Sequence, residues 1–453
     1  MGVKMSELFQ KLSRFPLQAA ISSVFFVYLA LYFLVPYKPW LSPISFHTPF
    51  LAFGLLLYAL QVWQEVRSGV FRLPLDISIF ALVVGLFWFS AGVIHFGDFS
   101  RAGVQAYTVS FCCLFFIRVA VNSVSLDRLV YWMKIYLIVS GILILLQVNF
   151  VSPFYVAGFL GQLNFGIGTQ GWGFGNTHIW AGGAAAWMLG IVLSRYAIEP
   201  KEQLRLPVEL LYVFSLGIGA AGLFYTMNRG AWLGLGLAII FLGGILVRSK
   251  VPLWRVLKGL AVMFIFVAFC RFTIHPDVYK MQEKIAFMGN VYDSPKLALV
   301  NDAASLTRLK AWGVALDGIK SNPFWGVGIG QYPALYEKAF PNLFKGLAAD
   351  KFDPNTKQIP HNSYLYYTVE AGLLPALLLF FFMGFIFFSG LRAGVSSAVF
   401  PFLIGGVTVC LWMVTCDYIN ERIFWIALGA VAGLGAVARP DKAGASPLTA
   451  SKP

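Results

Sequence analysis

Runs of about twenty consecutive apolar residues recur along this chain, and they constrain its fold more than any other feature. "LQAAISSVFFVYLALYFLV" (17–35) and "LLPALLLFFFMGFIFFSGL" (373–391) are two examples. A helix of that length crosses a hydrocarbon core of roughly 30 Å. Backbone groups in lipid must satisfy their own hydrogen bonds, so each run should be a helix. The sequence therefore predicts an all-α polytopic membrane protein.

Composition supports this class. Charged residues make up 12% of the 453 residues, about half the roughly 25% of a soluble domain. The first apolar run starts near Pro16 with no small-residue cleavage site behind it, so we expect a retained span and no signal peptide. The five cysteines are not spaced like CxxC, and we interpret them as apolar filler without a disulfide framework.

About twelve spans are expected, at residues 17–36, 46–63, 75–94, 103–121, 129–148, 177–195, 207–227, 231–247, 253–272, 364–389, 396–415 and 419–438. The termini and even-numbered connections hold 19 basic residues, against 4 in the short connections of the other face. The positive-inside rule then places both termini in the cytoplasm. The net charge of +14 mainly reflects this topology, and no nucleic-acid partner is expected.

The chain organisation follows from these spans. Residues 1–272 hold spans one to nine, 273–363 form one large external loop domain, 364–438 hold spans ten to twelve, and 439–453 form a disordered cytoplasmic tail. In the loop, "SLTRLKAWGVALDGIK" (305–320) has a helical stripe of apolar residues, and residues 321–340 combine turn signals with a second short helical pattern. An uncharged, Gly- and aromatic-rich external segment, 149–176, fits an interfacial or re-entrant piece that contacts carbohydrate or lipid.

Two arginines on the external face are candidate site residues. Arg229, in "TMNRGAWLGLGLA" (226–238), lies in the very short turn between spans seven and eight. A cation at a span end is expensive unless it is paired, so Arg229 either snorkels to lipid phosphate or serves a site. Arg308 lies one residue off the apolar stripe of the loop helix, where it either reaches over that face or stays in solvent. Lys310 is a further substrate-binding candidate, although we expect it to face solvent.

The third candidate is a histidine. His361, in "IPHNSYLYYTVEAGLLP" (359–375), stands where the large loop re-enters the membrane. Histidine titrates near neutrality, so it can accept a proton from a hydroxyl nucleophile; a solvated loop residue is the alternative. The histidines at 47, 95, 178 and 275 lack a supporting neighbourhood. The external loop has no carboxylate pair or DxD-type cluster, so we expect neither a metal nor a cofactor.

Two arginines and a histidine at one membrane face suit one kind of reaction. Arginine binds oxyanions bidentately and keeps its charge at any pH. A diphosphate leaving group gains charge as its glycosidic bond breaks, and fixed guanidinium groups stabilise that charge. The histidine would activate the attacking hydroxyl.

Three motifs carry a family resemblance. "NRGAWLGL", "TRLKAW" followed by "NPFWGVGIGQY", and "HNSYLYYTVEAGLLP", in this order, resemble the O-antigen ligase and O-antigen polymerase superfamily over roughly residues 210–390. The resemblance implies a GT-C-like glycosyltransferase of the bacterial inner membrane with a periplasmic site. The implied donor is an undecaprenyl-diphosphate-linked glycan, used without a metal. By the same resemblance Arg229 and Arg308 bind the diphosphate, His361 activates the acceptor, and Asn362 and Tyr364 support substrate binding.

The branches of this superfamily differ in their acceptor. Ligases use lipid A–core oligosaccharide, polymerases another lipid-linked repeat, and a third branch a hydroxyl amino acid in proteins. We favour the ligase, because the chain lacks the additional external domain that protein-glycosylating enzymes tend to append. A transporter would also have about twelve spans, but the paired halves and interrupted, charged spans of many transporters are not evident. A non-catalytic export scaffold would leave the two arginines and the histidine unexplained.

Overall fold

The computed structural model describes residues 17–34, 48–69, 73–121, 125–149, 178–273, 303–343, 359–416 and 422–437. Within these ranges every regular element is a helix. The longer apolar helices are α2 (Leu17–Leu34), α3 (Thr48–Arg67), α4 (Leu75–Phe89), α5 (Arg101–Ala120), α6 (Leu126–Asn149), α7 (His178–Ile198), α8 (Leu206–Tyr225), α9 (Arg229–Arg248), α10 (Trp254–Thr273), α16 (Leu373–Arg392), α17 (Val399–Trp412) and α18 (Arg422–Val437). A π-helical turn, η1 (Ser90–Ile94), extends α4, and a 3₁₀ turn, η5 (Met413–Thr415), extends α17.

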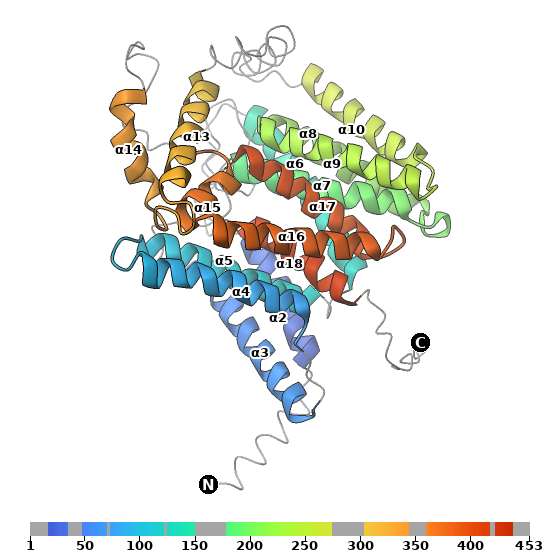
Figure 1. The fold of residues 1–453 in the computed structure, drawn as a ribbon. Helices are drawn as coiled ribbons and strands as arrows, with labels where there is room; N and C mark the ends of the chain where they lie inside the picture. Colours follow the sequence, from blue (N-terminus) through green and yellow to red (C-terminus); the bar gives the residue numbers. More distant parts are fainter. Residues whose placement is uncertain are drawn as a thin grey trace.

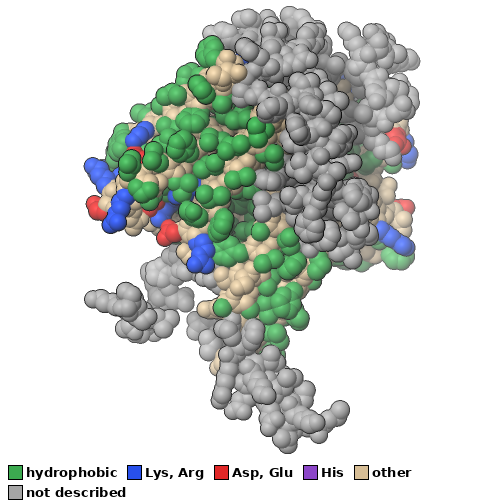
Figure 2. All heavy atoms as spheres, turned by 180° about the vertical axis from the view of Figure 1, so that it is seen from behind, with side chains coloured by type: hydrophobic (Ala, Val, Ile, Leu, Met, Phe, Trp, Pro, Cys, Tyr) green, Lys and Arg blue, Asp and Glu red, His purple; other side chains and the backbone are tan. Residues whose placement is uncertain are grey.

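The predicted class is confirmed. Nine helices of the described chain are long and apolar enough to cross a membrane, and three shorter apolar helices lie over the predicted first, eleventh and twelfth spans. Figure 2 shows the surface that results: green apolar side chains cover the middle of the described face, and charged side chains gather toward its edges. The protein is a multi-pass membrane protein, and the number of spans stays a prediction.

One expected span is not a single continuous helix. Residues 364–389 were predicted as a single helix, but the chain forms α15 (Ser363–Ala371) and then α16, with Gly372 between them at φ 91° and ψ 168°. That backbone region is open only to glycine. The loop segment 322–330 occupies the break, because Leu373 N–H donates to the Pro323 carbonyl at 2.8 Å and Val327 N–H to the Val369 carbonyl at 2.8 Å. The spanning helix is therefore α16, and α15 precedes it.

This break allows a direct test. A Cβ at residue 372 would lie 2.2 Å from the Phe324 carbonyl oxygen, so Gly372→Ala combines a backbone clash with a forbidden φ. We expect it to lower the free energy of unfolding by about 2 kcal/mol or more. Gly384→Ala is the matched control on α16, since a Cβ there meets nothing within 4 Å. Thermal unfolding of the detergent-solubilised protein measures both, and equal stability of the two variants would contradict the structural importance of the break.

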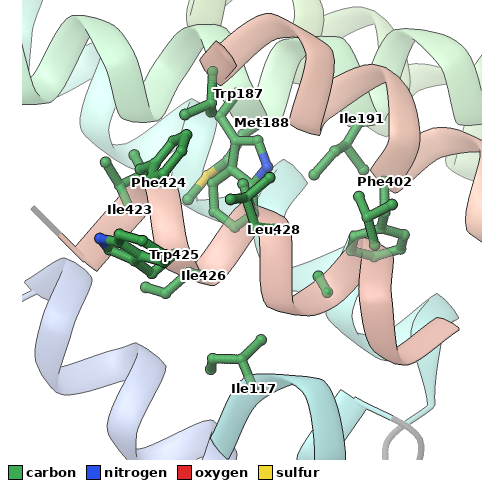
Figure 3. Close-up of a cluster of buried hydrophobic side chains, with 14 of the residues drawn as sticks. Ile117, Trp187, Met188, Ile191, Phe402, Ile423, Phe424, Trp425, Ile426 and Leu428 are labelled. Carbon is green, nitrogen blue, oxygen red and sulfur yellow. The ribbon is translucent and has the colours of Figure 1, made fainter. Parts of the chain in front are cut away.

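Helices α7 and α17 form the centre of the bundle. Almost every residue of α7 is buried, as expected for a helix that is apolar or small on all sides. Its small residues let α17 approach closely: a Cβ on Gly183 would lie 2.2 Å from the Trp412 ring. Figure 3 shows side chains of α7, α17, α18 and α5 meeting in this core, with Trp187 and Trp425 among them.

Two helices of the large loop stand at one end of the bundle. They are α13 (Ala303–Ser321) and α14 (Tyr332–Leu343), and both follow the helical patterns expected there. Figure 1 shows them beside α15, where the chain turns into α16. The predicted segment 149–176, apart from its first residue, the loop stretches 274–302 and 344–358, and the predicted tail 439–453 lie outside the described residues.

Candidate functional site

Arg229 is the first residue of α9. The turn 226–228 joins it to α8, with Met227 at φ 56°. Asn228 holds this turn in two ways: its Oδ1 accepts the Ala231 N–H at 3.1 Å, and its Nδ2 donates to the Ile179 carbonyl at 2.9 Å. The first bond is an ordinary N-cap, and the second ties the start of α9 to the start of α7. Arg229 is thus held at the end of the bundle, with its side chain partly exposed.

The residues after α17 connect Arg229 to His361. On one side, a Cβ on Gly230 would lie 1.9 Å from Thr415 Oγ1, so the first turn of α9 lies directly against Thr415. On the other side, the Ser363 hydroxyl donates to the Cys416 carbonyl at 2.7 Å. The residue after Arg229 and the second residue after His361 therefore both contact the dipeptide Thr415–Cys416, although Arg229 and His361 are 132 positions apart along the chain.

His361 has an unusual backbone conformation. Its φ of 48° is left-handed, which is uncommon outside glycine although histidine is among the residues that tolerate it. The following residue, Asn362, caps α15: its Oδ1 accepts the Leu365 N–H at 3.0 Å. The bend at His361 and the cap at Asn362 direct the chain from the loop into α15, and they leave the imidazole partly exposed. Strained residues of this kind tend to occur at functional sites.

Arg308 reaches the same region from α13. Trp312 lies one turn after Arg308, on the same side of the helix. Its indole N–H donates to the Pro360 carbonyl at 2.5 Å, directly before His361. The side of α13 that carries Arg308 therefore faces the start of α15. Lys310 lies about 200° around the helix from Arg308, on the opposite flank, so the structure does not bring it to the two arginines and His361.

Tyr364 has a structural partner. Its hydroxyl donates to the Cys410 carbonyl at 2.8 Å, and its ring packs on Phe380 at 5.6 Å between centroids. These contacts join α15 to α17 and α16. Together with the capping bond of Asn362, they show that both residues position the helix after His361, and substrate contact by either stays a prediction.

The arrangement can stabilise negative charge next to a proton acceptor. The two arginines and the histidine come from segments of α9, α13 and the start of α15 that meet at one end of the apolar bundle. In the part of the chain that the structure describes, no group of three His, Cys, Asp or Glu side chains is placed to hold a metal ion. Of the three candidate residues, the two arginines carry a permanent positive charge, which suits phosphate oxygens.

Several residues near the site were missed by sequence reasoning. The segment 322–330 docks on the turn between α4 and α5, where Ser100 N–H donates to the Ile329 carbonyl at 2.8 Å. His95 was expected to have no supporting neighbourhood, but its Nε2 hydrogen-bonds the Trp325 carbonyl at 3.0 Å, which corrects that expectation. Thr415 and Cys416 carried no sequence signal, because their role is only to lie between two helix ends.

A family model matches the part of the chain that contains these residues. The family model described as O-antigen ligase matches residues 214–381. Residues 214–381 are therefore similar to an O-antigen ligase domain. The matched region runs from α8 into α16 and contains Arg229, Arg308 and His361, so the motifs that suggested the family lie inside it. No curated protein matches the chain as a relative.

The O-antigen ligase family is one of membrane glycosyltransferase-like enzymes that act in lipopolysaccharide biosynthesis. Its members use lipid-linked glycans and acceptors of the lipid A–core type in general. The helices before α8 lie outside the matched region, and some of them pack against it: α6 and α7 lie against α8, and α4 lies against α16.

Proposed function

We propose that this protein is an O-antigen ligase, which transfers a glycan from undecaprenyl diphosphate to a sugar hydroxyl of lipid A–core oligosaccharide. The observation that carries the proposal is the convergence of Arg229, the Arg308 side of α13 and His361 at one end of the bundle. Thr415 and Cys416 connect the start of α9, which carries Arg229, to the start of α15, which follows His361. The bond from Trp312 to Pro360 connects the Arg308 side of α13 to the same place.

In the proposed reaction step, His361 and the two arginines have separate roles. The acceptor hydroxyl oxygen attacks the anomeric carbon of the donor, and the bond from that carbon to the diphosphate oxygen breaks with its electron pair. The acceptor proton passes to His361. The leaving diphosphate gains charge, and Arg229 and Arg308 stabilise it more strongly in the transition state than in the ground state. No covalent intermediate with the enzyme is needed.

The proposed location follows from the charges. The 19 basic residues of the termini and even-numbered connections favour a cytoplasmic position for that end of the bundle. Arg229, Arg308 and His361 would then face the periplasm of a bacterial inner membrane, where both lipid-linked substrates have their glycans. Apolar outer surfaces of the helices would contact membrane lipid and the donor's polyprenyl chain.

The test is reconstitution with separate acceptors. We expect purified protein in EDTA to join an undecaprenyl-diphosphate-linked glycan to lipid A–core, because the arginines themselves supply the positive charge. Product is measured by the mobility shift of the glycan-bearing lipid A–core. A strict requirement for a divalent cation would contradict the mechanism, and adding back Mg²⁺ or Mn²⁺ to the EDTA-treated protein is the control.

A polymerase is the second candidate, because the matched family and the same three residues suit transfer to another lipid-linked repeat. The two functions separate in the same assay. Elongation of a lipid-linked repeat, with lipid A–core left unmodified, would replace the ligase assignment with a polymerase. Transfer to a serine- or threonine-containing protein would indicate the protein-glycosylating branch, and glycan movement across the vesicle without transfer would indicate a transporter.

A further inference from the structure

A buried carboxyl group lies at the end of the helix that His361 precedes. Glu370, in the last turn of α15, is only 1% exposed. Its Oε1 accepts the N–H of Tyr332 at 3.4 Å, where α14 begins. The N–H of Gly330 and the hydroxyl of Tyr366 also hydrogen-bond this carboxyl group. All three partners are donors, so their hydrogen bonds favour the ionised carboxylate, which can only accept, while burial opposes that ionised form.

These bonds lie on a path between the two helices of the candidate site. Glu370 holds the first residue of α14, Tyr332, by its backbone. The hydroxyl of the same tyrosine donates to the Ala311 carbonyl of α13 at 2.8 Å. Ala311 is three residues from Arg308 along α13. The path therefore runs from α15 through Glu370 and Tyr332 to the helix that carries Arg308.

We propose that Glu370 is a positioning residue for the transfer reaction, whose carboxylate fixes the Arg308 helix against the helix that follows His361. This rests on the proposed function, since it names a residue that acts through Arg308 and His361. Glu370 itself is 1% exposed, so it would act through the residues that it contacts. Loss of its charge would let α13 and α15 shift relative to each other, and misplacement of about 1 Å is enough to reduce a reaction strongly.

Folding stability gives the proposal a distinctive signature. Burial is the largest influence on Glu370, and it raises the pKa of this carboxyl group from 4.5 to about 7, while the three donors lower it. Among the described residues, the phenols that interact with this carboxyl group include those of Tyr366 on α15 and Tyr107 on α5. Because the folded pKa is raised, the stability it contributes is fully present below pH 4.5 and is lost as pH rises through about 7. The charged form thus destabilises the fold at neutral pH.

Glu370→Gln separates function from folding. The amide keeps the shape but neither ionises nor carries charge. At pH 8 we expect kcat to fall on the order of tenfold with the acceptor KM unchanged. The midpoint of thermal unfolding at pH 8 should equal or exceed that of the wild type. Between pH 5 and pH 8 the wild-type midpoint should decrease more than that of the variant. A purely structural carboxylate would instead make the variant less stable at pH 8, which would overturn the proposal.

The pH profile of transfer supplies a second readout. As pH falls through about 7, protonation of Glu370 should weaken transfer in addition to protonation of the catalytic base. The acid limb of log kcat/KM should therefore be less steep in Glu370→Gln than in the wild type. Identical limbs, with unchanged kcat at pH 8, would also overturn the proposal. Tyr332→Phe removes only the bond to Ala311, and we expect its effect and that of Glu370→Gln to be less than additive.

Two controls complete the experiment. Glu337→Gln makes the same chemical change on the exposed side of α14 and should leave both kcat and the pH profile unchanged. His361→Asn tests the proposed function separately. If that variant transfers normally, the proposed mechanism fails; if it is inactive while Glu370→Gln resembles the wild type, only the positioning role fails.

Discussion

Replacing His361 with asparagine should lower kcat/KM for glycan transfer by a factor of about 10²–10⁴, the usual contribution of a general base. Asparagine is the better choice than alanine, because His361 has φ 48° and asparagine tolerates that conformation. The helix cap at Asn362 and the bond from Ser363 to Cys416 stay intact. The loss should therefore appear in transfer and not in the thermal unfolding midpoint.

The matched control for this variant is His95→Gln. His95 is partly buried, and its ring hydrogen-bonds the Trp325 carbonyl at 3.0 Å, where the loop segment 322–330 contacts the turn between α4 and α5. A glutamine amide can still donate to that carbonyl, so transfer should stay near the wild-type rate. Normal transfer by His361→Asn, or an equal loss in both variants, would remove His361 from the chemistry.

Arg229→Ala should reduce kcat/KM by about 10²–10³, the loss expected when a fixed donor to a developing negative charge is removed. Arg229→Lys should be intermediate, because lysine keeps the charge but cannot bind two phosphate oxygens with one planar group. The decrease should appear in kcat/KM for the donor, measured by varying the lipid-linked glycan at saturating acceptor. The KM for the acceptor should change little.

The control for Arg229 lies on the same helix. Arg248, the last residue of α9, is exposed at the opposite end, so Arg248→Ala makes an equal change in charge away from the site. We expect it to transfer normally. The Asn228 cap at the start of α9 does not involve the Arg229 side chain, so Arg229→Ala should fold. A variant with the wild-type rate at subsaturating donor would contradict the role in diphosphate binding.

The spans were predicted correctly where local hydrophobicity alone determines the helix. The prediction failed where a contact with a distant segment interrupts the helix. Residues 373–392 are apolar throughout and form a helix because lipid demands it. The preceding residues are also mostly apolar, so the whole stretch resembled one span. Gly372 gave little warning, since glycine is common in membrane helices. The break depends on Pro323 and Val327, about fifty positions earlier in the chain, which hydrogen-bond the backbone on both sides of it.

The candidate residues show the same division. Arg229 and His361 stand out by charge and by place, beside a short turn and at the start of an apolar run. Asn362 and Tyr364 are predicted to support substrate binding, and in the structure their hydrogen bonds cap α15 and join it to α17. A polar side chain next to a catalytic candidate does not by itself reveal whether it faces substrate or the protein.

The sequence by itself determined that the protein is a helical membrane protein, where most of its helices lie, and which three side chains could handle a diphosphate and a hydroxyl. Those conclusions depend on helical periodicity, on the solvation of backbone in lipid and on charge, which are properties of neighbouring residues. Only the tertiary structure decided that Arg229, His361 and the Arg308 side of α13 converge, and that Glu370 links two of their helices. Convergence depends on how α7, α9, α15 and α17 pack, and that packing is set by small residues such as Gly183 and Gly230 at close helix contacts.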